Sequence, residues 1–361
     1  MRESCGQVPH FRSRVRSAQL LRTQAEHCRP TSPLTHALLV GAAQDLEAGG
    51  VTAQVLADEL DAAPDSLPGL RLAAALHHLV LTRAAPRLAL HYPSVGGSAR
   101  PATLWADAAQ TLAEHGDRVR ARMAATAVQT NEIGRSGPLW GGLQVAAQRA
   151  GVAGVRLLEV GASGGLNLRP DRIGYGVDAE VLGDPDSPLR LDAGWTGRPP
   201  ADLSRPLRVV HRAGCDVHPV DVTTADGRLH LSSFVWPDDA RRWERLRGAL
   251  ALAAAEPVVV QPLSGADFLA RELAQPHPGE LTVLWHSVVW QYVSPAERER
   301  GRAVLARAAA AATPQAPLAL LVLEPVHPSG RFELRLRWWP SAPEVVVLGH
   351  GSPHGTPFTW A

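Results

Sequence analysis

One stretch, VRLLEVGASGGLNL at 155–168, constrains the fold of this chain more than any other. Its first half is aliphatic, which is typical of a buried parallel strand. Gly161, Gly164 and Gly165 follow, and glycines allow a sharp turn in which backbone N–H groups approach a ligand closely. Glu159 lies at the carboxyl end of the predicted strand, where open α/β sheets bind their ligands. The stretch therefore predicts an α/β fold with a ligand-binding turn.

The composition narrows the class of protein. The 361 residues are 45% hydrophobic and 20% charged, which indicates a globular chain of one or two domains. A formal net charge of +1 gives no reason to expect a nucleic-acid partner, and the absence of lysine excludes lysine nucleophiles. Three scattered cysteines argue against disulfides and against a structural zinc site, and so predict a cytoplasmic protein without a metal. The lack of a long apolar run predicts that no segment spans a membrane. The oligomeric state stays open.

Two regions of different periodicity divide the sequence. Apolar residues recur at helical spacing over 17–150, which predicts a helical N-terminal domain after a flexible extension at 1–16. Over 151–361, apolar strands alternate with amphipathic helices, which predicts a doubly wound, mostly parallel Rossmann-like sheet. The segment 167–206 is rich in Pro, Gly and Asp and predicts a hairpin-containing insertion. The last two apolar stretches predict an antiparallel edge.

The acid and glycines of EVGASGG resemble the first motif of class I S-adenosylmethionine-dependent methyltransferases, with Ser163 in the place of the middle glycine. The resemblance implies a methyltransferase-like sheet, S-adenosyl-L-methionine as cofactor and a small or medium-sized substrate. The residues implied at the cofactor here are Glu159, Gly161, Ser163 and Gly165.

In that family, an acid at the end of the second strand binds the ribose of the cofactor. Asp216, in GCDVHP, stands where this acid is expected, and a carboxylate accepts both hydroxyl donors. Such an acid is expected about 20 residues after the glycine turn, and Asp216 lies about twice as far along. Asp221 is the fallback, and the insertion offers Asp178 or Glu180.

The ends of the third and fourth predicted strands complete the implied site. Asp267 and Phe268 resemble the residues that meet the adenine, although Asp267 is equally a candidate helix N-cap. The loop after the fourth strand faces the methyl group in the family, so it supplies the candidates for substrate handling. His286 and Tyr292 are the predicted catalytic residues, since a histidine near neutral pH can deprotonate a nucleophile. The further candidates here are Ser287, Trp290 and Gln291.

A polar cluster, VQTNEIGRSGPLW, lies outside the predicted sheet at 128–140. Ser136 before Gly-Pro is a candidate helix cap. Asn131, Glu132 and Arg135 are left over. They form either a site wall that binds substrate or a capping network, and we favour substrate binding.

The motifs taken in order, from SPLTHALL through QTNEIGRS to WHSVVWQY, resemble from about Gln19 onward an uncharacterised, mainly actinobacterial family. Two other functions stay open. Gly-x-Ser-x-Gly is also the nucleophile elbow of serine hydrolases, with Ser163 followed by Asp267 and by His350 or His354. Alternatively, the chain is a ligand-binding protein that has lost catalysis.

Overall fold

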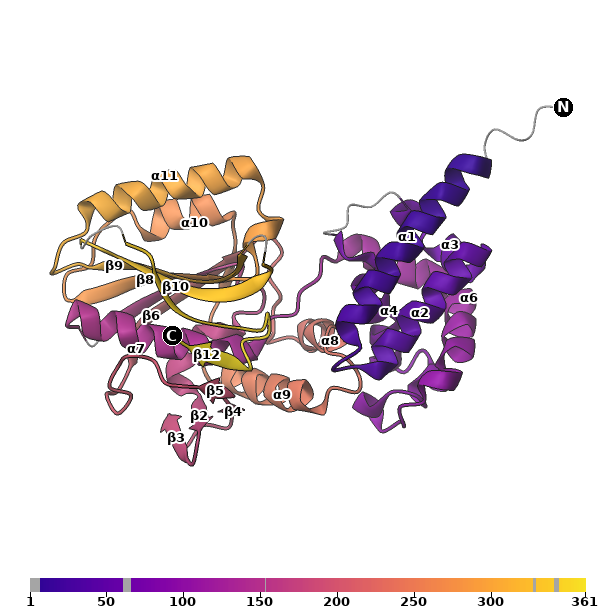
Figure 1. Ribbon diagram of the computed structural model, residues 1–361, viewed down its shortest axis with the longest axis horizontal. Coiled ribbons are helices and arrows are strands. Elements are labelled where there is room, and N and C mark those ends of the chain that lie inside the picture. Colours follow the sequence, from indigo (N-terminus) through magenta and orange to yellow (C-terminus); the bar gives the residue numbers. More distant parts are fainter. Residues whose placement is uncertain (1–6, 61–65, 153, 327–328, 341–343) are drawn as a thin grey trace. The chain divides into compact units, whose positions relative to one another are not determined.

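A computed structural model describes residues 7–60, 66–152, 154–326, 329–340 and 344–361 (Figure 1). These residues form two compact units. The helical unit runs to Thr130 and includes 229–244, and the sheet unit comprises 131–228 and 245–361.

Five helices of the helical unit, α2, α4, α5, η3 and α6, have proline at their first or second position. Pro33 begins its helix after Ser32, whose Oγ accepts the N–H of Thr35 at 3.0 Å, the usual role of a serine N-cap. Residues 7–16, expected in a flexible extension, form the start of a helix, which their arginines favour. The elements are α1 (Gln7–Cys28), α2 (Pro33–Ala48), α3 (Val51–Val55), η1 (Ala57–Glu59), α4 (Pro68–Leu81), α5 (Pro86–Ala89), η3 (Pro93–Val95) and α6 (Pro101–Ala125).

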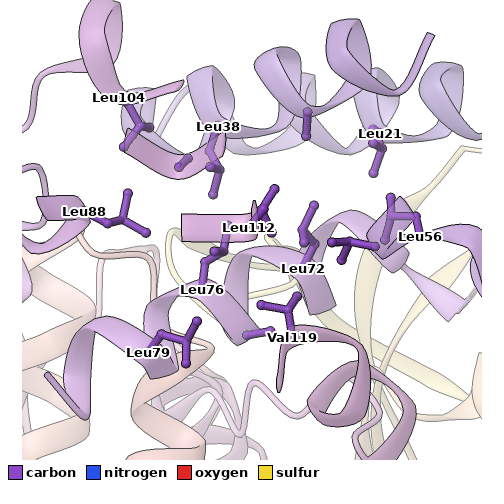
Figure 2. Close-up of a cluster of buried hydrophobic side chains, with 14 of the residues drawn as sticks. Leu21, Leu38, Leu56, Leu72, Leu76, Leu79, Leu88, Leu104, Leu112 and Val119 are labelled. Atoms are coloured by element: carbon purple, nitrogen blue, oxygen red, sulfur yellow. The ribbon is translucent and has the colours of Figure 1, made fainter. Parts of the chain in front are cut away.

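One apolar core holds the helical unit together (Figure 2). Leu72 and Leu76, one turn apart on α4, are both fully buried, as helical periodicity requires. Leu21 of α1 and Leu38 of α2 pack into the same core, and each buried leucine contributes about 1.5–3 kcal/mol. The segment 229–244 joins this unit through Asp238, which accepts the N–H of Leu34 at 3.0 Å.

The sheet unit contains a nine-stranded sheet and a three-stranded one. The strands are β1 (Gly154–Val160), β2 (Gly174–Val177), β3 (Glu180–Gly183), β4 (Arg190–Asp192), β5 (Trp195–Thr196), β6 (Arg208–Asp216), β7 (Val260–Pro262), β8 (Glu280–Ser287), β9 (Leu318–Val326), β10 (Arg331–Trp339), β11 (Val346–Gly351) and β12 (Phe358–Trp360). The helices are η4 (Ile133–Arg135), α7 (Ser136–Ala150), η5 (Leu166–Leu168), η6 (Pro170–Arg172), α10 (Gly265–Glu272), η7 (Trp290–Tyr292) and α11 (Pro295–Ala311). The unit boundaries fall within α8 (Ala225–Ser233) and α9 (Ala240–Ala255).

The large sheet is mostly parallel, with the order β5-β12-β11-β10-β9-β8-β1-β6-β7. The neighbours from β7 to β9 all pair in parallel. The pairs β9–β10, β10–β11 and β11–β12 are antiparallel, which confirms the antiparallel pairing predicted for the C-terminal strands. Within the described residues, no helix has the length and apolarity needed to cross a membrane.

Helices cover both faces of the sheet (Figure 1). Leu157 of β1 faces α7 and packs with its Leu139, whereas Leu158 faces α10 and packs with its Phe268. Successive strand residues point to opposite faces, so one strand contributes to two cores. The helix α7, predicted within the N-terminal domain, thus belongs to the sheet unit.

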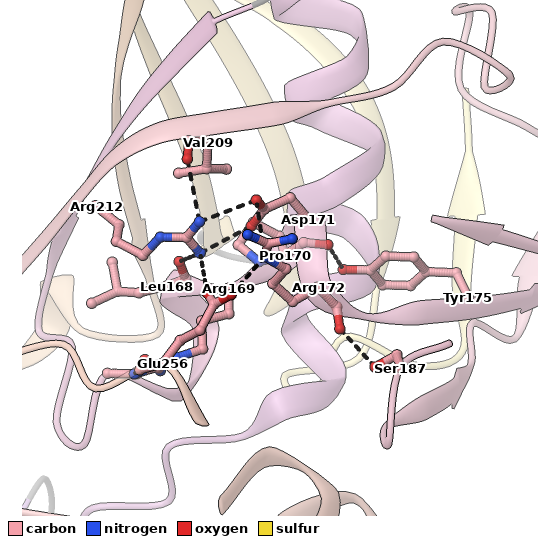
Figure 3. A network of polar contacts seen from close by, with 11 residues as sticks. Leu168, Arg169, Pro170, Asp171, Arg172, Tyr175, Ser187, Val209, Arg212 and Glu256 are labelled. Atoms are coloured by element: carbon pink, nitrogen blue, oxygen red, sulfur yellow. Dashed lines mark hydrogen bonds and ion pairs between the residues drawn. The ribbon is translucent and has the colours of Figure 1, made fainter. Parts of the chain in front are cut away.

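The connection from β1 to β6 contains the predicted hairpin, β2–β3, but η5 and η6 stand where an α-helix would usually follow the first strand. A polar network anchors it (Figure 3). Arg212 of β6 binds both carboxylate oxygens of Asp171, at 3.0 and 3.1 Å. The Tyr175 hydroxyl donates to the carbonyl of Pro170 at 2.8 Å, and Arg169 donates to the carbonyl of Glu256. These bonds fix the insertion against the sheet.

Candidate functional site

A cavity of about 920 Å³ lies at the edge of the sheet where the parallel strands end. Gly161, Asp216, His286 and Glu324 line it from the carboxyl ends of β1, β6, β8 and β9. Much of the remaining lining is aliphatic and comes from the sheet, α10 and α11. Ligands bind at this edge of open α/β sheets, and the volume lies within the range of small-molecule pockets, about 300–1,000 Å³.

Every second residue of the glycine turn after β1 has a positive φ. Gly161, Ser163 and Gly165 have φ values of +74°, +53° and +69°. Glycine adopts this conformation readily, but serine does so at a cost, so surrounding contacts must hold Ser163 in place. The N–H groups of Gly161 and Ala162 both donate to the carbonyl of Cys215, at 2.9 Å each, which ties the turn to the end of β6.

Two side chains brace this turn. Asp216 Oδ2 accepts the N–H of Ser163 at 3.0 Å. Asn131 donates from Nδ2 to the carbonyl of Ala162 and accepts the N–H of Leu166, both at 3.2 Å. The motif GCDVHP and the polar cluster at 128–140 therefore meet at the glycine turn, although they are far apart in the sequence.

The turn is also packed tightly against the loop after β8. A Cβ atom on Gly161 would lie 2.4 Å from Cγ2 of Val289. Glycine is needed here for its φ and for this close approach. The carboxyl ends of β1 and β8 are thus in direct contact beside the cavity.

Glu159 lies on the other face of the sheet from the cavity. The alternation along β1 turns it toward the α7 face with Leu157, and it is only 2% exposed. Burial raises the pKa of Glu159 to about 8, partly opposed by the positive charge of Arg135. Its Oε2 has no hydrogen-bond partner among the described residues. Glu159 is a buried carboxyl group beside the turn, and it does not line the cavity.

A histidine–glutamate pair occupies the cavity wall. His286 Nδ1 lies 2.8 Å from Glu324 Oε1, and the two residues are 8% and 3% exposed. The same oxygen accepts the N–H groups of Val289 and Trp290, at 3.1 and 3.3 Å. Glu324 therefore orients the imidazole and shapes the loop after β8.

Of the other candidates from this segment, Trp290, Gln291 and Tyr292 also line the cavity, whereas Ser287 does not. The Trp290 ring stacks on His286, with centroids 5.0 Å apart. The guanidinium groups of Arg298 and Arg302 lie 5.8 and 5.7 Å from the Trp290 ring. Cations over an aromatic face are attracted to it, so Trp290 connects the histidine to a positively charged part of α11.

Side chains of the polar cluster at 128–140 hydrogen-bond to the glycine turn and to the loops around it. Glu132 accepts the N–H of Gly134 at 3.1 Å and pairs with Arg245 at 3.4 Å. Arg135 donates to the carbonyls of Pro353 and Ser287, at 2.9 and 3.3 Å. Asn131, Glu132 and Arg135 are buried and do not line the cavity. Their contacts lie within the protein and match the capping network, the alternative to the substrate-binding wall that we favoured from the sequence.

Ser136 is not the cap of its helix. It is the first residue of α7, and Arg135 in the cap position makes no side-chain cap bond. The Ser136 hydroxyl instead donates to Asn167 Oδ1 at 2.7 Å. The preceding η4 turn already supplies helical geometry, so no serine cap is needed.

Asp267 and Phe268 do not reach the cavity lining. Ser264 is the N-cap of α10, and the half-exposed Asp267 pairs with Arg300 and with the Ser264 hydroxyl. Phe268 is fully buried in the core beneath α10. The alternative ribose acids Asp178 and Glu180 are exposed and pair with Arg198.

Glu324 and Arg335 are among the cavity residues that sequence reasoning missed. Asp216 is the last residue of β6, and Glu324 lies two residues before the end of β9, so an acid near a strand end was the available signal. Arg335 carries no local signal, because its place depends on the pairing of β10 with β9.

Comparison with known proteins places the chain in a family. No curated protein and no solved structure matches it significantly. The family model described as "Uncharacterized protein conserved in bacteria (DUF2332)" matches residues 18–360. The chain therefore belongs to this bacterial family, as its motifs predict.

Proposed function

We propose that this protein is an S-adenosylmethionine-dependent methyltransferase that acts on a small or medium-sized molecule. The observation that carries the proposal is the contact between Asp216 and the glycine turn at one end of the cavity. The motif and the acid come together despite the long insertion between them.

The strand order supports the same proposal. Numbered along the chain, the five parallel strands β7, β6, β1, β8 and β9 have the spatial order 3-2-1-4-5. This is the order of Rossmann-type sheets, in which ligands bind where the order reverses. The reversal falls between β1 and β8, where Gly161 contacts Val289.

The residues present fit an adenosine group at this end of the cavity. Asp216 Oδ2 and Oδ1 each accept one backbone N–H, from Ser163 and His218. A carboxylate has about four acceptor positions, so two stay available for ribose hydroxyls. Gly161 and Gly265 present backbone without a side chain at the lining. The proposed cofactor set within the cavity is therefore Gly161 and Asp216.

The histidine–glutamate pair supplies the remaining chemistry. When bound, S-adenosylmethionine provides an electrophilic methyl group. His286 would accept the proton of a hydroxyl or amine on the substrate, since Glu324 holds the other ring nitrogen. Trp290, Gln291 and Tyr292 would contact the substrate from the same loop.

Calorimetric titration with S-adenosylhomocysteine tests the proposal. We expect micromolar binding, which corresponds to about −8 kcal/mol. Asp216→Asn removes the charge that holds the ribose and should weaken binding at least tenfold. Asp221→Asn is the matched control, because Asp221 is an exposed loop acid that accepts from Thr223 and does not line the cavity. No binding by the wild type, or equal effects of the two substitutions, would contradict the proposal.

A further inference from the structure

The far end of the cavity carries a second set of charged side chains. Strand pairing puts Arg335 of β10 opposite Val322 of β9, and Val322 opposite His286 of β8. All three residues line the cavity. Two strand spacings separate the backbones of His286 and Arg335, which is roughly 10 Å. Arg337 lies in the next row of the same face, opposite Leu320.

The acids that line the cavity are already engaged elsewhere. Asp216 accepts backbone N–H groups, Glu324 pairs with His286, and Glu297 pairs with Arg300 at 2.9 Å. Four arginines line the same cavity: Arg298, Arg302, Arg335 and Arg337. The lining therefore holds one arginine more than it holds acids, and one of the four, Arg302, pairs with Glu299 outside the lining.

Of these four arginines, Arg335 has the fewest contacts among the described residues. Across the described parts of the chain its side chain makes no hydrogen bond or ion pair, and its Nε is buried. The buried Nε of Arg337 likewise has no partner there, and its guanidinium lies 5.0 Å from the Trp339 ring. Because Arg335 donates to no acceptor among the described residues, its guanidinium keeps paired N–H donors for an anionic ligand in the cavity.

Between the two charged ends the walls are apolar. Leu284 and Leu320 form the sheet side, and Leu269 and Leu305 the helix side. Gly301 of α11 lines the same space, and a Cβ there would meet only Leu269 Cδ1, at 4.0 Å. There is room beside Gly301 for part of an apolar molecule.

We propose that the methyl acceptor is an amphipathic anion, with an apolar body between the sheet and α11 and a carboxylate or similar group on Arg335 and Arg337. Arginine binds such groups through paired N–H donors. The assignment of this molecule as methyl acceptor rests on the proposed methyltransferase function. The binding of an amphipathic anion in the cavity is independent of that function.

Binding of decanoate below its micelle concentration, measured by calorimetry, tests the charge requirement. We expect decanoate to bind and decyltrimethylammonium, of equal chain length and opposite charge, not to bind. Arg335→Gln should weaken decanoate binding at least tenfold. Arg331→Gln is the control on the same strand, because Arg331 is exposed and pairs with Glu333 at 2.8 Å. Equal binding of both amphiphiles, or no loss in Arg335→Gln, overturns the proposal.

Gly301→Leu tests the apolar part without removing a charge. The leucine should fill the space beside α11 and lower decanoate affinity at least tenfold, while Gly301→Ala should change it less than threefold. Circular dichroism and thermal unfolding verify that each variant folds, and unchanged affinity in folded Gly301→Leu overturns the proposal.

S-adenosylhomocysteine titrated into the same wild-type preparation separates the two proposals. Decanoate binding without S-adenosylhomocysteine binding rejects the methyltransferase and retains the anion site. The reverse result rejects the anion site alone.

Discussion

Nδ1 of His286 and Oε1 of Glu324 lie 2.8 Å apart across two adjacent parallel strands. Both residues are buried, and both line the cavity. A carboxylate at Nδ1 favours the tautomer with the proton on that nitrogen, which leaves Nε2 as the acceptor. The pair therefore has the arrangement of a general base with a positioning acid.

Removing the Glu324 carboxylate should remove the preference of His286 for the Nδ1–H tautomer. In Glu324→Gln we expect nitrogen NMR to report a mixture of imidazole tautomers where the wild type reports Nδ1–H. A wild-type spectrum with the proton on Nε2 would contradict the arrangement.

His286→Gln should lower methyl transfer by about 10²–10⁴-fold, the usual contribution of a general base, and leave S-adenosylhomocysteine binding within about threefold. His350→Gln serves as the control, since His350 lies on β11 and does not line the cavity. An equal loss of turnover in His286→Gln and His350→Gln would contradict the general-base role, because it would indicate a shared structural effect of losing a histidine.

The raised pKa of Glu159 predicts a pH-dependent stability. With a folded pKa of about 8 and an ordinary value of 4.5, the folded protein keeps a proton that the unfolded chain releases. Stability should therefore fall as pH rises from about 5 to 8, by on the order of 3–5 kcal/mol from this group. Glu159→Gln should lose that dependence, so its advantage over the wild type should grow with pH. Denaturant unfolding at pH 5, 6.5 and 8 checks this, and parallel pH dependences would refute it.

Gly161→Ala should destabilise the protein by about 2–4 kcal/mol, through a positive φ and a clash with Val289. Gly151→Ala is the matched control, because Gly151 has φ +69° and no atom within 4 Å of its added Cβ. It should cost only about 1–2 kcal/mol. Adding Val289→Ala should recover part of the Gly161→Ala loss, seen as a non-additive double-mutant cycle in urea. If the destabilisations by Gly161→Ala and Val289→Ala simply add, the predicted contact between Val289 and the turn is contradicted.

Ser163→Ala separates the methyltransferase from the serine hydrolase. The backbone N–H that Asp216 accepts is retained, so S-adenosylhomocysteine affinity should change by less than about 1 kcal/mol. A fluorophosphonate should not label the wild type at Ser163. Labelling, with esterase activity lost in the variant, would instead support the hydrolase.

Local signals predicted the elements of this protein well. The aliphatic run before Glu159 predicted β1, and apolar residues at helical spacing over 17–150 predicted helices there, because burial along a strand or a helix face repeats between near neighbours. The predictions that failed concerned contacts between residues far apart in the sequence. The face to which Glu159 turns, and the pairing that brings Glu324 to His286, depend on sheet register. Periodicity also predicted α7 as a helix without indicating that it packs on the sheet.

The short turns η5 and η6 after β1 have a consequence for any shortened form of this protein. No long helix begins at the glycine turn, so no helix dipole steadies its left-handed residues. The side-chain amide of Asn131, which precedes the first strand in the sequence, stabilises the turn instead, through hydrogen bonds to Ala162 and Leu166. A chain trimmed to begin at residue 151 would keep the residues of every strand, but it would lack both α7 and the Asn131 amide that braces the glycine turn.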